Sequence, residues 1–214
     1  MPQWIVDEAN EDLEILADTL TKMRVSVYRP KDMDFPRLGG MYNYCPRDRL
    51  LIYGNTIVDP VMMYPCRDVE IHCLEEVVNR SGRLLRMPRD EGIILDAANV
   101  CRLGDSMLFL ESASGNRKAY EWLCERFPEV EIELCNFYAG VHIDSTIVAL
   151  REGLVMLNAA RVKPDNVPKV FENWDKIWVD EVVAQGFHEY PYASKWIAMN
   201  MLTVDPHTVI VDRH

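Results

Sequence analysis

The sequence has no CxxC pair and no cysteine spacing typical of a zinc site, although six of its 214 residues are cysteines. We therefore expect buried free thiols, without a metal centre. No cysteine follows Cys135, so the last third of the chain offers no thiol nucleophile. The cysteines are Cys45, Cys66, Cys73, Cys101, Cys124 and Cys135.

Long apolar runs and an excess of basic charge are also missing. No stretch approaches the about 20 apolar residues of a membrane span, and the opening MPQWIVDEANEDLEIL lacks the basic-then-apolar pattern of a signal peptide. The 34 acidic and 23 basic residues give a net charge of −11, which disfavours nucleic acid and favours cationic or zwitterionic small molecules. We expect a cytoplasmic protein that binds neither nucleic acid nor membranes.

The sequence does contain a repeat of about fifty residues, marked by turn signals between paired apolar runs. We predict a short strand before each hairpin, beginning at residues 25, 83, 131 and 177, and a helical segment after each of the first three. A helix is also predicted over residues 10–23. The four turns are Gly54-Asn55, Gly104-Asp105, Glu152-Gly153 and Asp205-Pro206.

Such a period indicates an α/β solenoid, propeller or ring with about three and a half copies of the unit, and we expect a partial propeller or ring. We expect one incomplete domain over residues 1–214, with modules at roughly 12–82, 83–128, 129–176 and an incomplete 177–214. An open ring leaves sheet edges uncovered, so we expect the sequence to be truncated at its C-terminus. The alternative is a set of unrelated α+β hairpins with accidental spacing.

Polar residues gather at the start of each hairpin, in the strings CPRD, ILDAAN, VHID and YASK. If residues 140–150 form a strand, His142 and Asp144 point to the same face. Equivalent points in a ring of repeats converge on its axis, so one cavity is expected to collect these side chains. They are Asp48, Asp96, His142, Asp144 and Ser194.

Several carboxylates and one histidine suit a guanidinium substrate, which stays protonated and presents a planar fork of donors. Arg161, in LNAARV, is a candidate clamp for a substrate carboxylate. Asp96 interrupts the apolar run GIILDAANVC, where an unpaired buried carboxylate is costly.

Simpler interpretations remain for the other residues. Asp48 suits a turn or a solvated ion pair, and His142 suits a hydrogen-bonded strand position. Arg161 can be a surface residue, and Ser194 can cap a turn.

The strings DAANVCRLGDSMLFLES, VHIDSTI, ARV and ASKWIAMNMLTVD resemble the glycine amidinotransferases of the guanidino-modifying pentein superfamily, from about residue 12 to the end. The resemblance implies an α/β propeller of five ββαβ modules around a central active site, usually in a homodimer. It also implies transfer of the amidino group of arginine to an amine such as glycine, through a Cys-amidino intermediate and without metal or cofactor.

By the same resemblance, His142 is the general acid/base and Asp96 hydrogen-bonds the guanidinium and orients the site. Asp48 and Asp144 contact the guanidinium. Arg161 binds the substrate carboxylate, and Ser194 contacts substrate.

The sequence departs from the family's pattern at several places. The nucleophilic cysteine of the family lies in a GGxxHC-like stretch that does not occur before residue 214. Cys45 is the only thiol at the start of a repeat and is expected to be a buried thiol, not a replacement nucleophile. Asn99 and Ala193 stand where some members have Asp and Ser, which leaves the acceptor amine open. The alternatives are an arginine deiminase-like hydrolase, against which DAAN argues, and a non-catalytic arginine-binding protein.

Overall fold

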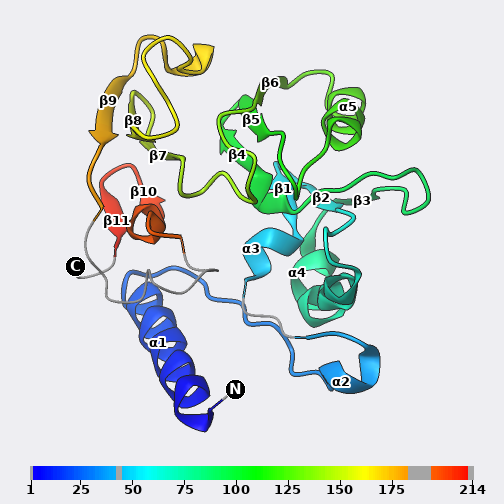
Figure 1. Ribbon diagram of the computed structural model, residues 1–214. Coiled ribbons are helices and arrows are strands. Elements are labelled where there is room, and N and C mark those ends of the chain that lie inside the picture. The colour runs from blue at the N-terminus through cyan, green and yellow to red at the C-terminus, as the bar shows by residue number, and fades with distance from the viewer. Residues whose placement is uncertain (1, 42–44, 183–193, 212–214) are drawn as a thin grey trace.

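The computed structural model describes residues 2–41, 45–182 and 194–211, and Ala193 lies outside them. Four small sheets follow one another along an open arc, with the short helix α3 (Pro46–Arg49) on its inner side (Figure 1). This mixed α/β arrangement agrees with the predicted partial propeller. Within the described residues, no helix combines the length and apolar character that crossing a bilayer requires.

Each sheet is built on an antiparallel hairpin, as the turn signals predict. Gly54, Gly104 and Gly153 occupy the turns with positive φ, which glycine adopts without steric cost. The fourth turn lies one residue later than predicted, because Asp205 still belongs to its strand. The hairpins are β1 (Leu51–Tyr53) with β2 (Thr56–Asp59), β4 (Val100–Leu103) with β5 (Ser106–Leu110), β7 (Ile147–Arg151) with β8 (Leu154–Asn158), and β10 (Leu202–Asp205) with β11 (Thr208–Ile210).

A third strand joins three of the hairpins, and it pairs in parallel with the hairpin that precedes it in the chain. The unit is thus hairpin, helical segment and strand, which is the ββαβ order that the family resemblance implies. Each third strand completes the sheet of the hairpin before it, whereas the sequence analysis placed this strand at the start of the next unit. The strand expected from residue 25 does not form, since residues 25–34 have no regular structure. The third strands are β3 (Arg83–Arg86), β6 (Glu131–Cys135) and β9 (Asp175–Val179).

The helical segments lie where the sequence predicts them, but some are 3₁₀ helices and not α-helices. Helix α5 (Arg117–Arg126) forms as predicted and buries Ala119 and Leu123. The segment after the first hairpin is mostly a 3₁₀ helix, η1 (Pro65–Leu74), and continues into α4 (Glu75–Arg80). The remaining elements are α1 (Gln3–Lys22), α2 (Phe35–Leu38), η2 (Ala97–Asn99), η3 (Lys169–Phe171) and η4 (Ile197–Met199).

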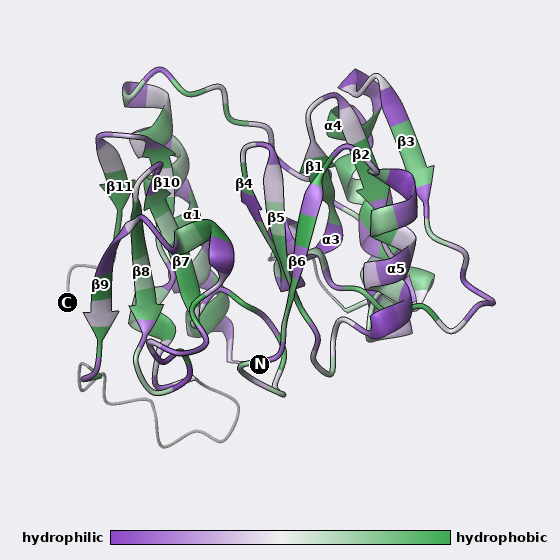
Figure 2. Cartoon of the chain, turned by 90° about the horizontal axis from the view of Figure 1, so that it is seen from above, coloured by the Kyte–Doolittle hydropathy of each residue, from purple (hydrophilic) through white to green (hydrophobic). Residues whose placement is uncertain are grey.

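The core lies on both faces of strand β5. Met107 and Phe109 pack into a cluster with α5 and the first sheet, whereas Leu108 and Leu110 pack into a second cluster with β8 and η3. Successive side chains of a strand point to opposite faces, so the continuous apolar run SMLFL reflects burial on both sides. In Figure 2, strands β7 and β8 are likewise hydrophobic over most of their length.

A short turn of helix or a tight turn precedes the first strand of each hairpin. Helix α3 leads into β1, η2 into β4, the turn at residues 144–146 into β7, and η4 into β10. These turns carry or adjoin the polar strings noted in the sequence, so the repeat brings chemically equivalent positions to the inner side of the arc.

Candidate active site

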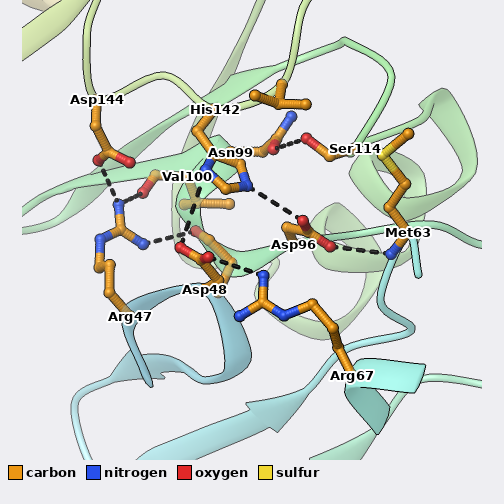
Figure 3. Close-up of polar contacts among 12 residues, drawn as sticks. Arg47, Asp48, Met63, Arg67, Asp96, Asn99, Val100, Ser114, His142 and Asp144 are labelled. Carbon is orange, nitrogen blue, oxygen red and sulfur yellow. Dashed lines mark hydrogen bonds and ion pairs between the residues drawn. The ribbon is translucent and has the colours of Figure 1, made fainter. Parts of the chain in front are cut away.

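His142 lies between two carboxylates that come from different modules (Figure 3). Its Nε2 is 3.1 Å from Asp96 Oδ2, and its Nδ1 is 3.9 Å from Asp48 Oδ1. All three side chains are largely removed from solvent, with 26% of the imidazole exposed and 10% or less of each carboxylate. The structure therefore brings Asp48, Asp96 and His142 together, across a sequence separation of 94 residues between the first and the last.

The loop that carries His142 is not a strand. Residues 141–146 form bends and turns, and β7 begins only at Ile147, so reading residues 140–150 as one strand holds only for the second half. The backbone on each side of His142 is fixed instead by hydrogen bonds to the second module. Ile143 N donates to Ala98 O at 3.1 Å, and Ser112 Oγ donates to Val141 O at 2.6 Å.

Asp96 is buried directly before η2, with 3% of the residue exposed. Met63 N donates to Oδ1 at 3.0 Å, which leaves Oδ2 toward His142. A buried carboxylate needs such partners because desolvating it unpaired is costly. Both of its oxygens are therefore used, one for anchoring and one for the imidazole.

Asp48, at the third position of α3, pairs with an arginine that the sequence analysis did not single out. Arg67 Nη1 donates to Asp48 Oδ2 at 2.9 Å, and its Nε and Nη2 donate to both carboxylate oxygens of Glu70. The interpretation of Asp48 as part of an ion pair is correct, but the pair is buried and not solvated. The only signal for Arg67 was its spacing of three residues from Glu70 within a predicted helix.

Asp144 lies at the edge of the same group and is held by Arg47. Arg47 Nη2 is 3.2 Å from Asp144 Oδ1, and the guanidinium also donates to the carbonyl oxygens of Ala97 and Val100. Arg47 thereby joins α3, η2 and the His142 loop. These contacts come from three modules, which is why local sequence patterns did not identify Arg47.

The charges of the site act on His142 in a definite direction. Burial, the largest influence, disfavours the imidazolium, but the hydrogen bond to Asp96 and the charges of Asp48, Asp96 and Asp144 outweigh it, so the pKa of His142 is raised. Burial also raises the pKa of Asp144, against the opposing charges of Arg47 and His142. The imidazole is thus suited to hold and release a proton near neutral pH.

Arg161 and Ser194 are not in contact with the carboxylates in the part of the chain that the structure describes. Arg161 Nη1 donates to Ser145 Oγ and Thr146 Oγ1, at 2.9 and 2.7 Å, directly after Asp144. Its guanidinium lies 3.7 Å over the Tyr138 ring, so it is half-buried and packed, unlike the surface residue of the alternative interpretation. Ser194 Oγ accepts from Trp196 N at 3.2 Å and caps the turn before η4.

Two further positions from the sequence analysis have structural roles. Cys45 is only partly buried, as are Cys66, Cys101 and Cys124, so the expectation of buried thiols holds for Cys73 and Cys135 and is wrong for these four. Burial, and then the charge of Asp48, still raise the pKa of Cys45, which disfavours the thiolate. Asn99 is fully buried, and its Nδ2 donates to Leu110 O and Ser112 Oγ. Because Ser112 Oγ in turn donates to Val141 O, Asn99 supports the loop that carries His142. Among the described residues, no three His, Cys, Asp or Glu side chains are placed to hold a metal ion.

Comparison with known proteins identifies the family, although no family model matches the chain. The chain is 36% identical to inosamine-phosphate amidinotransferase 1 of Streptomyces griseus, over 99% of this chain and 71% of that protein. The solved structure of the S. griseus enzyme superimposes with a TM-score of 0.91. The mitochondrial glycine amidinotransferase of Danio rerio is 25% identical, over 99% of this chain and 61% of its own length.

The same fold extends to a hydrolase. A dimethylarginine dimethylaminohydrolase superimposes with a TM-score of 0.75 at 16% identity, which shows a common fold alone. Both likenesses agree with the pentein fold that the sequence resemblance implies. On the extent and identity of the match to the Streptomyces enzyme, the chain belongs to the amidinotransferase family.

Proposed function

We propose that this chain binds the guanidinium group of arginine and supplies the acid/base residues for transfer of its amidino group to an amine. The observation that carries the proposal is the placement of His142 between Asp96 and Asp48, at 3.1 and 3.9 Å. A guanidinium stays protonated and presents N–H donors in a plane, and carboxylates accept these donors in pairs. Asp48 and Asp144 are the proposed acceptors.

In the proposed reaction, a thiolate attacks the amidino carbon of arginine and the bond from that carbon to the δ-nitrogen breaks. His142 donates a proton to the departing amine, which leaves as ornithine. The incoming amine then attacks the same carbon through its nitrogen. As it does so, the neutral imidazole of His142 takes a proton from that nitrogen. The carbon–sulfur bond breaks, the thiolate re-forms and the guanidino product leaves.

The attacking thiol is, in this proposal, none of the six cysteines of the sequence. Cys45 is close to Asp48, but the pKa of its thiol is raised by burial and by that carboxylate, which opposes thiolate formation. We propose that the nucleophile lies beyond residue 214. The reaction as proposed uses no metal or cofactor.

Arg161 and Ser194 are proposed to contact the amino-acid part of the substrate. Arg161 is held beside the His142 loop by Ser145, Thr146 and Tyr138, so its guanidinium is already oriented. Such a group suits a carboxylate. The predicted homodimer likewise remains a proposal.

The proposed acceptor amine is chosen by comparing how similar this chain is to relatives that use different acceptors. The sequence resemblance suggested glycine, but identity is 36% to an inosamine-phosphate amidinotransferase and 25% to a glycine amidinotransferase. We therefore favour an aminocyclitol phosphate over glycine. The hydrolase alternative predicts citrulline or ammonia from arginine with no acceptor.

The test uses the 214-residue chain and a version extended by the downstream coding sequence, each incubated with arginine and either acceptor. We expect both to bind arginine, and only the extended version to release ornithine together with a guanidino product, which is guanidinoacetate when glycine is the acceptor. Citrulline or ammonia would support the hydrolase. Binding by both versions without turnover would support a non-catalytic arginine-binding protein.

In the extended protein, His142→Ala is expected to lower kcat by about 10²- to 10⁴-fold, the usual contribution of a general acid/base. Asp96→Ala is expected to lower kcat by a similar factor, because it removes the carboxylate that is hydrogen-bonded to the His142 imidazole. His207→Ala is the matched control, because His207 is exposed in the β10–β11 turn. Wild-type rates for either site variant would contradict the assignment.

A further inference from the structure

Arg67 forms a buried ion-pair bridge between Asp48 and Glu70. Its Nη1 is 2.9 Å from Asp48 Oδ2, and its Nε is 2.7 Å from Glu70 Oε1. Only 8% of the Arg67 side chain is exposed, with 10% of Asp48 and none of Glu70. Charges this far removed from water interact strongly with one another, so the bridge affects both the geometry and the electrostatics of the site.

The bridge assigns different roles to the two oxygens of Asp48. Oδ2 accepts the hydrogen bond from Arg67, whereas Oδ1 points to His142 Nδ1 at 3.9 Å (Figure 3). That distance exceeds a hydrogen bond, so Oδ1 keeps its capacity to accept one. Because Glu70 fixes the guanidinium with two hydrogen bonds, the orientation of Asp48 is fixed in turn.

The bridge also balances charge around the imidazole. His142 faces the carboxylates of Asp96, Asp48 and Asp144, and the Cys45 thiol lies near the last two. An imidazole beside so many uncompensated negative charges would retain its proton and lose its use as a base. In the part of the chain that the structure describes, Asp48 is paired with Arg67, and Asp144 with Arg47.

We propose that Arg67, held by Glu70, is a positioning residue that directs Asp48 Oδ1 toward His142 and offsets the charge of Asp48 there. The part of the inference that concerns a bound guanidinium rests on the proposed function. The part that concerns His142 holds in the ligand-free chain and is tested separately.

The experiment follows the imidazole of His142 by NMR titration of the ligand-free 214-residue chain, with its signal assigned by loss in His142→Ala. Arg67→Gln removes a nearby positive charge, so the pKa of His142 is expected to rise. Glu70→Gln removes a negative charge and is expected to lower it. Arg80→Gln is the control, because Arg80 pairs with Glu76 on the exposed side of α4.

A purely structural role for Arg67 gives a different result. Loosening the site would admit water and move the pKa of His142 back down toward its ordinary value in both variants. An unchanged or lowered pKa in Arg67→Gln would overturn the proposal. If Arg67→Gln does not fold, Arg67→Lys takes its place. It keeps the positive charge beside Asp48, so the pKa of His142 is expected to stay unchanged, and a fall toward the ordinary value would overturn the proposal.

Arginine binding, measured by calorimetry, completes the test. Arg67→Gln is expected to weaken binding about tenfold, because Asp48 is no longer held. If the wild-type chain binds no arginine, the proposed function fails, while the titration still decides the role of Arg67. If the wild type binds and Arg67→Gln binds equally well, the positioning of Asp48 for a ligand is wrong.

Discussion

At the scale of single residues, the site is a set of buried and partly exposed charges in which the carboxylates of Asp48, Asp96 and Asp144 each have a partner. Asp96 uses a backbone N–H, whereas Asp48 and Asp144 each use an arginine. Desolvation makes an unpaired carboxylate costly, so these partners are a condition for placing three acidic groups near one imidazole. The consequences can be measured as changes in the pKa of His142 and in the free energy of unfolding.

Asp96→Asn tests the link between Asp96 and His142. Asparagine can still accept from Met63 N, but it removes the negative charge at His142 Nε2, so the pKa of His142 is expected to fall. The measurement is NMR titration of the imidazole. Asp105→Asn, in the exposed β4–β5 turn, is the control.

The same change has a predicted pH dependence in stability. Because the folded-state pKa of His142 is raised, its stabilisation is complete below the unfolded pKa of about 6.5 and is lost as the pH rises through the folded value. The difference in free energy of unfolding between wild type and Asp96→Asn is therefore expected to be larger at about pH 5 than at about pH 8. A difference that increases with pH would contradict this sign.

Asn99→Asp tests the support beneath the His142 loop. The amide Nδ2 donates to Leu110 O and Ser112 Oγ, and Ser112 in turn holds Val141 O. A carboxylate cannot donate these bonds, so we expect a loss of about 1–3 kcal/mol in the free energy of unfolding, measured in urea. Asn79→Asp, on the exposed side of α4, should change it by less than about 0.5 kcal/mol.

At the scale of elements, local signals predicted the hairpins well because each needs only a turn and two flanking apolar runs. They failed where long-range contacts decide. Residues 141–146 alternate as a strand does, yet hydrogen bonds to Ala98 and Ser112 hold them as turns. Asp48, Asp96 and His142 were found through their equivalent positions in the repeat. Arg47 and Arg67 were missed because the site carboxylates that they bind, Asp144 and Asp48, lie in other segments of the chain.

The start of α5 gives a prediction at this scale. Asn116 Oδ1 accepts from Ala119 N at the first turn of the helix and from Ile94 N, while its Nδ2 donates to Gly92 O in the segment that leads to Asp96. Asn116→Ala removes all three contacts and is expected to cost about 1–2 kcal/mol in the free energy of unfolding. Asn116→Asp keeps the helix cap and should cost less. Equal losses in urea would show that the cap is not the stabilising contact.

At the scale of the whole molecule, the fourth hairpin differs from the other three. Strands β2, β5 and β8 each carry a parallel third strand, but no described residue pairs with the outer edge of β11. Apolar side chains of this hairpin and of the residue after it are exposed, with 42% of Leu202, 42% of Val209 and 53% of Val211 accessible. Uncovered edges and apolar surface of this kind favour association between chains.

We therefore expect the 214-residue chain to associate with itself in a concentration-dependent way in sedimentation velocity. Val209→Lys places a charge on β11 and is expected to weaken the association at least tenfold, or by about 1.4 kcal/mol. Met41→Lys is the matched control, because Met41 is 65% exposed and lies outside every strand, so it adds the same charge elsewhere. A chain that stays monomeric at all concentrations would contradict the prediction. Equal weakening by both variants would show that net charge, and not the edge of β11, governs the association.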